Sequence, residues 1–289
     1  MITVRLKECT TANIRKGGMI MLRVGMLTSG GDCQALNAAM RGVAKSLFNQ
    51  CSEVEIYGFT DGYKGLIYGE YRLLKNDDFS GILNIGGTIL GSSRMPFKYI
   101  GVPLEDGSDK IERMIDTYKK LNLDCLVVLG GNGSHKTANL LREKGLNVLT
   151  LPKTIDNDLA LTDHTPGYGS AAKYIGTSMK EIIRDSFCLE YEKGVVSIVE
   201  IMGRNAGWLT GSTALSQGED CEGPDLIYLP ELPFDLQLFG EKIRQLLQEK
   251  TSIVVAVSEG IRTADDVNGS LAGIPSNYLD LAQLEDYWS

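Results

Sequence analysis

The chain has 289 residues, a formal net charge of −8 and an isoelectric point near 5.0. A hydrophobic content of 43% and a mean hydropathy of −0.07 predict a globular protein with a large core. The acidic charge argues against nucleic acid as a partner, and no apolar run is long enough to span a membrane. The six cysteines are scattered without a CxxC pair, which favours a reducing, cytoplasmic location.

Strands and helices are expected to alternate after a short N-terminal extension, residues 1–21, which lacks the apolar segment of a secretory signal. The strands are predicted at 22–27, 54–59, 125–129, 148–151, 195–201, 226–229 and 253–257. The helices are predicted at 35–47, 110–121, 136–144, 170–187 and 236–249. This alternation indicates βαβ units with right-handed crossovers. We therefore predict a two-lobed, doubly wound α/β fold with mainly parallel sheets, the lobes being 22–167 and 168–263, followed by a divergent tail, 264–289.

Glycine-rich turns follow several of the predicted strands, at 28–32, 86–88 and 130–134. The first and third join a strand to a helix, so their backbone N–H groups and the helix dipole would face an anion. The second continues to Arg94, whose planar, permanently charged guanidinium suits a phosphate. None of the turns matches the P-loop or the dinucleotide fingerprint, and each alone could be no more than a tight turn. Together they predict a phosphate pocket of another type.

The segment Pro152-Lys153-Thr154-Ile155-Asp156-Asn157-Asp158 follows an apolar run, 146–151, that is predicted to be a buried strand. On an extended backbone Asp156 and Asp158 would share one face at the carboxyl end of that strand. Ligands bind at this edge of open α/β sheets. One carboxylate could then accept a proton from a substrate hydroxyl while the other helps to hold a metal ion. The alternative is a polar loop, which the glycine-rich segments in equivalent positions make less attractive.

Two further segments follow strands in the second half of the chain. Met202-Gly203-Arg204 comes after the strand at 195–201 and places a guanidinium at a strand end. Glu231 follows the strand at 226–229 and could accept a sugar hydroxyl, although a solvated loop residue is an equal alternative. Trp208 and Tyr63 fit either a core or a pocket wall.

Taken in order, these segments resemble the phosphofructokinase A family, which phosphorylates fructose 6-phosphate at its 1-hydroxyl in glycolysis. The matching residues are Leu27-Thr28-Ser29-Gly30-Gly31-Asp32, Asp61-Gly62-Tyr63, Gly86-Gly87-Thr88 through Arg94, Gly130-Gly131-Asn132-Gly133-Ser134, Thr154-Ile155-Asp156-Asn157-Asp158, Met202-Gly203-Arg204 and Pro230-Glu231. The resemblance covers about residues 22–261. It implies the two-lobed fold, Mg²⁺ as a cofactor and a homo-oligomer, either tetramer or dimer.

The resemblance also implies roles for individual residues. Asp156 would be the general base and Thr154 would bind the transferring phosphoryl group, with Arg204 as a third catalytic residue. The implied substrate-binding residues are Thr154, Ile155, Asp156, Met202, Gly203, Arg204 and Glu231. The implied phosphoryl-donor residues are Gly30, Tyr63, Arg94, Met95, Gly131, Asn132, Gly133 and Ser134. The implied metal ligands are Asn132 and Asp158.

The identity of the phosphoryl donor depends on residues that point in different directions. Asn132 stands where ATP-using members usually carry a magnesium-binding Asp. Lys153 replaces a Gly of many bacterial ATP enzymes and is frequent in pyrophosphate users, whereas Gly133 is typical of ATP users. We favour ATP, because Gly133 leaves room for the nucleotide, and keep pyrophosphate as the alternative.

Two departures from the family pattern favour a third reading. Val195 occupies the position of an arginine that reaches a neighbouring subunit's substrate. The tail from Ala264 onward lacks the Gly-His-x-Gln-Arg-Gly-Gly type of segment that supplies sugar-phosphate contacts. The chain would then be a shortened, non-catalytic subunit that binds a sugar phosphate or a nucleotide.

Overall fold

The computed structural model describes residues 21–31, 33–188 and 193–264. The chain forms two compact units, Met1–Thr154 and Ile155–Ser289, called unit 1 and unit 2 below. The predicted lobes, which are defined by the ligand that each would bind, stay a prediction. Most of the predicted extension and tail lies outside the described residues.

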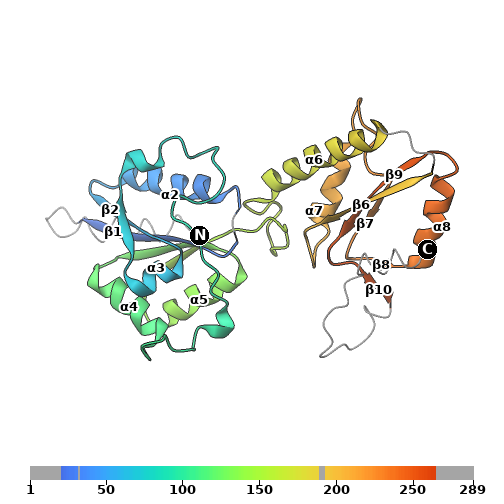
Figure 1. The fold of residues 1–289 in the computed structure, drawn as a ribbon. Coiled ribbons are helices and arrows are strands. Elements are labelled where there is room, and N and C mark those ends of the chain that lie inside the picture. The colour runs from blue at the N-terminus through green and yellow to red at the C-terminus, as the bar shows by residue number, and fades with distance from the viewer. Residues whose placement is uncertain (1–20, 32, 189–192, 265–289) are drawn as a thin grey trace. The chain divides into compact units, whose positions relative to one another are not determined.

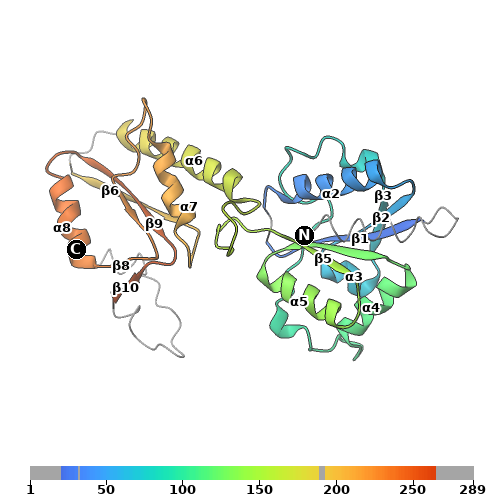
Figure 2. The same ribbon diagram turned by 180° about the vertical axis from the view of Figure 1, so that it is seen from behind.

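Unit 1 is built on a five-stranded sheet with the order β3-β2-β1-β4-β5. The strands are β1 (Leu22–Ser29), β2 (Val54–Phe59), β3 (Tyr71–Leu74), β4 (Cys125–Gly130) and β5 (Val148–Pro152). Every pair is parallel except β2 with β3. Helix α2 covers one face of the sheet, and α3, α4 and α5 cover the other (Figures 1 and 2). The two covered faces explain why the central strands β1 and β4 are almost wholly buried.

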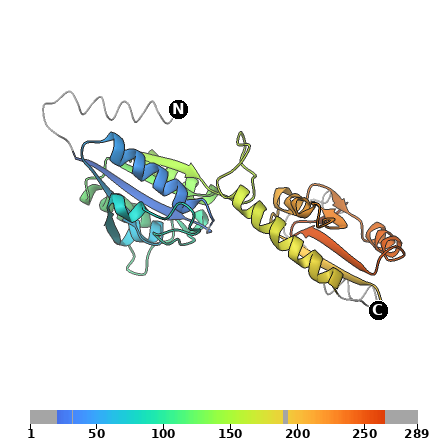
Figure 3. The ribbon, with the colours of Figure 1, turned by 90° about the horizontal axis from the view of Figure 1, so that it is seen from above.

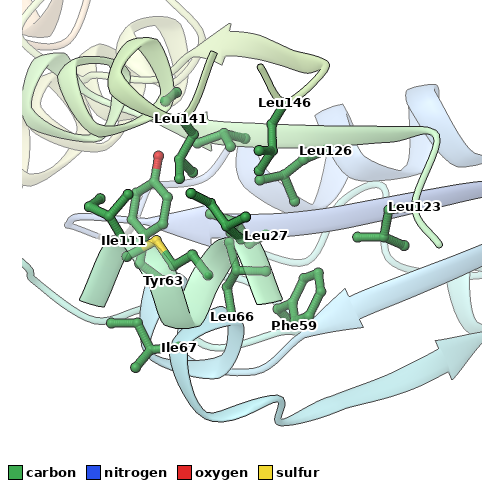
Figure 4. Packing of buried hydrophobic residues seen from close by; sticks show 14 of the residues in the cluster. Leu27, Phe59, Tyr63, Leu66, Ile67, Ile111, Leu123, Leu126, Leu141 and Leu146 are labelled. Carbon is green, nitrogen blue, oxygen red and sulfur yellow. The ribbon is translucent and has the colours of Figure 1, made fainter. Parts of the chain in front are cut away.

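The helices of unit 1 are α2 (Leu36–Gln50), α3 (Tyr63–Tyr68), α4 (Lys110–Lys120) and α5 (Asn132–Glu143), with 3₁₀ turns at Asn76–Phe79 and Phe97–Tyr99. The core between the sheet and α3–α5 contains Leu27, Phe59, Leu66 and Leu126 (Figure 4). Helix α3 and strand β3 were not predicted from the sequence. Their lengths of six and four residues are too short to display a hydrophobic period.

Two expectations for unit 1 were wrong. Strand β5 was expected to be buried, but it lies at the edge of the sheet and all five residues retain some exposure. An edge strand lacks a neighbour on one side, so an apolar sequence alone does not bury it. Helix α5 was expected to begin at residue 136, but it begins at Asn132. Most of the predicted loop at 130–134 is therefore the first turn of a helix.

Unit 2 contains a parallel three-stranded sheet with the order β6-β9-β7. These strands are β6 (Val195–Ile201), β9 (Ser252–Ser258) and β7 (Leu226–Tyr228). A smaller parallel pair joins β8 (Pro233–Phe234) to β10 (Arg262–Thr263). The helices are α6 (Tyr168–Cys188), α7 (Trp208–Gly211) and α8 (Leu236–Leu246), with a 3₁₀ turn at Ser212–Ser216.

The central strand β9 divides the core of unit 2 into two layers. Val254 and Ala256 pack with Met179 of α6, whereas Ile253 and Val255 pack with Ile243 of α8. Successive side chains of a strand point to opposite faces, so one apolar run serves both layers. Figure 3 shows α6 running alongside the sheet. The predicted α/β fold, with mainly parallel sheets and flanking helices, is confirmed.

Candidate active site

The carboxyl ends of β1 and β4 form the central part of one edge of the unit 1 sheet. The two strands are adjacent and parallel, with Ser29 in register with Gly130. From β1 the chain continues to β2 on one side of this pair, and from β4 it continues to β5 on the other side. The strand order therefore reverses between β1 and β4, which is where open α/β sheets bind their ligands. The predicted glycine turns at 28–32 and 130–134 flank this point, although Thr28 and Ser29 belong to the end of β1 and Gly130 to the end of β4.

The N-terminus of α5 presents backbone N–H groups at this edge. Its N-cap is Gly131, with an extended backbone, and no side chain in the described part of the chain caps the helix. Asn132 and Gly133 are exposed, and Ser134 is buried. The first N–H groups of a helix have no partner within it, and the helix dipole adds partial positive charge there. This end of α5 can therefore bind an anion, as the sequence predicted.

Two cationic side chains converge on the turn after β1. Lys153 is 8% exposed, and its ammonium donates a hydrogen bond to the carbonyl oxygen of Gly31. Its backbone N–H donates to the oxygen of Gly130 at 3.0 Å. The guanidinium of Arg94, an exposed residue, has Nη2 3.6 Å from the point that a Cβ on Gly31 would occupy. The turn thus combines close backbone approach with two positive charges, both of which favour a phosphate ligand.

Tyr63 and Ser134 are buried residues that link α3 to the first turn of α5. Tyr63 is 1% exposed, and its hydroxyl donates to the carbonyl oxygen of Ser134 at 2.7 Å. Burial raises the pKa of the Tyr63 phenol far above its usual range, so the group stays a neutral donor. Met95 packs against the same apolar cluster. These contacts leave the Tyr63 side chain almost no surface on which to touch a nucleotide.

Buried polar groups of β1 and α2 hydrogen-bond the segment that leads to Arg94, and the sequence did not single them out. The Thr28 hydroxyl donates to the oxygen of Gly91 at 2.7 Å. The Asn37 amide donates to the oxygen of Ile85 at 3.0 Å and accepts from the N–H of Ile89 at 2.8 Å. The position of Asn37 on the apolar face of the predicted helix 35–47 could have indicated a buried polar contact of this kind.

The acidic motif lies at the boundary of the units, with Thr154 ending unit 1 and Ile155 beginning unit 2. The backbone bends at Ile155 and Asp156, and Asn157 has a left-handed φ of 57°. The extended geometry assumed for Asp156 and Asp158 is therefore wrong. Asp156 is half-buried and Asp158 is exposed.

Asn157 is the residue of this motif that sequence reasoning missed. Its side chain is 6% exposed, accepts from the N–H of Thr165 at 2.8 Å and donates to the oxygen of Asp163 at 3.2 Å. Asn adopts left-handed conformations and forms such local turns more readily than other residues. An Asn between two carboxylates was thus a readable signal for a bend.

In unit 2 the carboxyl ends of the parallel strands are tied together. The N–H of Gly203, after β6, donates to Glu259 Oε1 at 3.0 Å, and its carbonyl oxygen accepts from Ser258 Oγ at 2.8 Å. A Cβ on Gly260 would lie 1.8 Å from the carbonyl oxygen of Arg204. Met202 and Arg204 remain exposed on this turn. Glu259 is a supporting residue that was not predicted.

Glu231 supports a neighbouring turn of unit 2. Its Oε1 accepts from the N–H of Gly207, the N-cap of α7, at 2.6 Å, although the residue as a whole is exposed. Glu231, which was predicted to contact the sugar, therefore also forms a hydrogen bond within the protein. Trp208, 56% exposed, begins α7 and meets Tyr168 edge to face.

The predicted metal ligands offer an amide oxygen, from Asn132, and a carboxylate, from Asp158. Both are exposed and both are oxygen donors of the kind that Mg²⁺ prefers. Within the described ranges, no three His, Cys, Asp or Glu side chains group into a metal site. Mg²⁺ is commonly held by one or two carboxylates with substrate phosphates and water, so each of these oxygen donors by itself suits a metal that arrives with a phosphorylated ligand. In the same ranges, no helix has the length and apolarity needed to cross a membrane.

Comparison with known proteins agrees with this geometry. The family model described as phosphofructokinase matches residues 23–283, which extends beyond the last motif recognised in the sequence. An ATP-dependent 6-phosphofructokinase of Spirochaeta thermophila is 46% identical over 246 residues, covering 84% of this chain and 64% of the relative. The ATP-dependent 6-phosphofructokinase 3 of Bacteroides thetaiotaomicron is 37% identical, with coverages of 84% and 69%. The chain thus spans about two thirds of the length of these curated relatives.

Solved structures give the same result. A pyrophosphate-dependent phosphofructokinase from Marinobacter aquaeolei matches with a TM-score of 0.69 and 28% identity, covering 84% of this chain and 61% of that one. The Pichia pastoris phosphofructokinase in the T-state matches with a TM-score of 0.69 and 28% identity, covering 91% and 28%. The family model alone covers most of the chain. The chain therefore belongs to the phosphofructokinase family.

Proposed function

We propose that the protein transfers a phosphoryl group from ATP to the 1-hydroxyl of fructose 6-phosphate, giving fructose 1,6-bisphosphate for glycolysis. The observation that carries the proposal is the edge of unit 1, where the uncapped N-terminus of α5 adjoins the turn lined by Lys153 and Arg94. An edge of this kind suits the phosphates of a donor. The curated relatives named above are ATP-dependent 6-phosphofructokinases, which supports the donor and the acceptor.

The catalytic step is an in-line displacement. The 1-hydroxyl oxygen attacks the γ-phosphorus of ATP, the bond from that phosphorus to its bridging oxygen breaks, and ADP leaves with the electron pair. Asp156 takes the hydroxyl proton, and Thr154 binds the transferring group. Asn132 and Asp158 are the proposed ligands of Mg²⁺, which would supply charge neutralisation for the donor phosphates. Positioning and charge stabilisation carry most of the catalysis in such reactions.

The sugar phosphate is assigned to unit 2. Arg204 would bind its phosphate, and the exposed Met202 and the buried Gly203 precede it on the same turn. Ile155 and Glu231 complete the proposed set. The tight bonding of Gly203 to Glu259 supports this assignment, because a fixed turn presents the guanidinium in one place.

ATP is favoured as the donor because of the space at Gly133. A Cβ on this residue would have no atom within 4 Å, so the exposed first turn of α5 leaves room for a nucleotide. Pyrophosphate is the second candidate, and the buried ammonium of Lys153 is the observation that favours it. In the compact pyrophosphate, both phosphates would lie close to that charge.

The donor is identified by initial rates with fructose 6-phosphate and Mg²⁺ plus either ATP or pyrophosphate. We expect turnover with ATP. Gly133→Asp should reduce this turnover, because it places a negative charge in the space proposed for the donor, while a Cβ at this position clashes with no atom of the protein. If pyrophosphate supports turnover and ATP does not, the assignment of ATP as the donor is wrong. Lys153→Gly is the complementary variant, and it should weaken pyrophosphate use more than ATP use.

The base is tested with Asp156→Asn. Its turnover should fall by about 10²- to 10⁴-fold, because general base catalysis contributes an effect of that size. Little change would contradict the mechanism. Binding of fructose 6-phosphate in calorimetry without turnover by any donor would instead support the non-catalytic subunit.

The assembly is a separate part of the proposal. We expect a homo-oligomer, either a tetramer or a dimer, as in the family. Sedimentation velocity over a range of concentrations measures the mass directly. A monomer at every concentration would contradict this expectation.

A further inference from the structure

Asn157 is a buried amide whose acceptor and donor are both used. Oδ1 accepts from the N–H of Thr165 at 2.8 Å, and Nδ2 donates to the oxygen of Asp163 at 3.2 Å. Asn157 is 6% exposed and Thr165 is 3% exposed, so water does not compete well for these bonds. One side chain thus closes the loop from residue 157 to residue 165.

Few of the other residues of this loop are buried. Leu161 is completely exposed and has a left-handed φ of 59°, so it contributes no apolar anchor. Asp158 and His164 are also exposed. The buried contacts of the loop lie at its two ends, where the amide of Asn157 joins them.

The backbone of Asn157 adds a second constraint. Its φ of 57° turns the chain immediately after Asp156, so that Asp156 and Asp158 are not on one extended strand. Asn tolerates this conformation, whereas most residues with a Cβ do not. The position of Asp156 relative to the loop that follows it therefore depends on the turn at Asn157.

We propose that Asn157 is a positioning residue, which fixes the loop 157–165 through its side-chain amide and thereby holds Asp156 in its catalytic orientation. The proposal rests on the proposed role of Asp156 as the base. It separates two contributions of one residue: the left-handed backbone, which glycine also provides, and the amide bonds, which glycine lacks. The side-chain bonds are the part assigned to positioning.

The decisive variant is Asn157→Gly in the full chain, because it keeps the backbone turn and removes both amide bonds. Asn157→Asp is the conservative variant, since it keeps an oxygen that can accept from the N–H of Thr165. Asn122→Gly is the matched control. Asn122 also has a left-handed φ, 49°, but it is exposed at the end of α4 and lies in unit 1.

Two readouts are expected to change together. In Asn157→Gly, hydrogen exchange of the Thr165 amide should accelerate at least about tenfold, because its acceptor is gone, while amides of β4 keep their protection. Turnover should fall about 10- to 100-fold from misplacement of the base. Asn157→Asp should restore Thr165 protection, and Asn122→Gly should alter neither readout.

The inference is overturned if Asn157→Gly keeps the Thr165 amide protected, or if it loses that protection and retains wild-type turnover. A fall in turnover accompanied by general loss of amide protection would also overturn it, because the residue would then act only on folding. The proposed function fails separately, through wild-type turnover in Asp156→Asn. If Asp156→Asn keeps wild-type turnover, hydrogen exchange of the Thr165 amide still shows whether the Asn157 side chain closes the loop.

Discussion

At the carboxyl edges of the two mainly parallel sheets, the backbone N–H groups have different partners. In unit 1 the N-terminus of α5 has no side-chain cap in the described residues, and Lys153 and Arg94 bring positive charge to the adjoining turn. In unit 2 the corresponding turns are bonded by the protein's own carboxylates, Glu259 to the N–H of Gly203 and Glu231 to the N–H of Gly207.

This difference decides whether the backbone N–H groups at comparable places in the two sheets stay available to a ligand. A carboxylate that caps a turn satisfies its N–H groups, so an anion bound at such a turn has to be held by side chains such as Arg204. An uncapped helix N-terminus leaves them for a ligand. Helices α4 and α8 have the side-chain caps that α5 lacks, with Asp109 accepting at 2.7 and 3.0 Å and Asp235 at 2.8 and 3.0 Å.

Gly260→Ala should disrupt the bonded edge of unit 2 most strongly. The added Cβ would lie 1.8 Å from the carbonyl oxygen of Arg204, and backbone cannot move aside as a flexible side chain can. We expect a loss of about 1–3 kcal/mol in the free energy of unfolding, the usual cost of overpacking, measured by urea denaturation. Gly211→Ala is the control, because a Cβ there meets no atom within 4 Å. Equal stability of the two variants would contradict the close approach.

Glu259→Ala should have a smaller effect on the same edge. It removes the charged acceptor of the Gly203 N–H, which should cost about 1–2 kcal/mol. Glu259→Gln keeps an oxygen at that position and should cost less than half as much. The two variants are compared by thermal and urea unfolding. If both lose the same stability, the bond to Gly203 is not what Glu259 contributes.

The sequence predicted the strands of the two main sheets other than β3, and most helices, because their apolar periods are long, as in β9 and α6. It also placed Gly30 and Gly131 directly after strands, where the structure has them, whereas the turn at 86–88 does not directly follow a strand. It did not predict β3, an antiparallel edge strand of four residues, or the edge position of β5, since strand order depends on pairing between distant segments. Short elements and strand order are set by tertiary contacts rather than by local pattern.

The site was predictable in its residue types and less so in its geometry. Gly131 and Lys153 were selected correctly as residues of one edge, because both follow adjacent strands. The bend at Asn157 was missed, because the i, i+2 argument for Asp156 and Asp158 assumed an extended chain. The bond from Glu259 to Gly203 joins residues 56 positions apart, and no local pattern signals such a contact.

The most direct test of the unit 1 edge converts it into the kind of edge found in unit 2. Gly131 has the extended backbone of an N-cap, and a Cβ there would meet only the Lys153 carbonyl oxygen, at 3.6 Å. Gly131→Asp should therefore cap α5 and leave the stability unchanged or slightly raised. Asp109→Ala is the reverse control, because it uncaps α4 and should lose about 1 kcal/mol without affecting the donor.

The measurement is calorimetric titration of Mg·ATP into the wild type and Gly131→Asp. If the N-terminus of α5 binds the donor phosphates, the affinity of Gly131→Asp should be at least about tenfold lower, or 1.4 kcal/mol, with an undiminished unfolding temperature. An unchanged affinity in a stably folded Gly131→Asp variant would contradict the assignment of the donor to this edge.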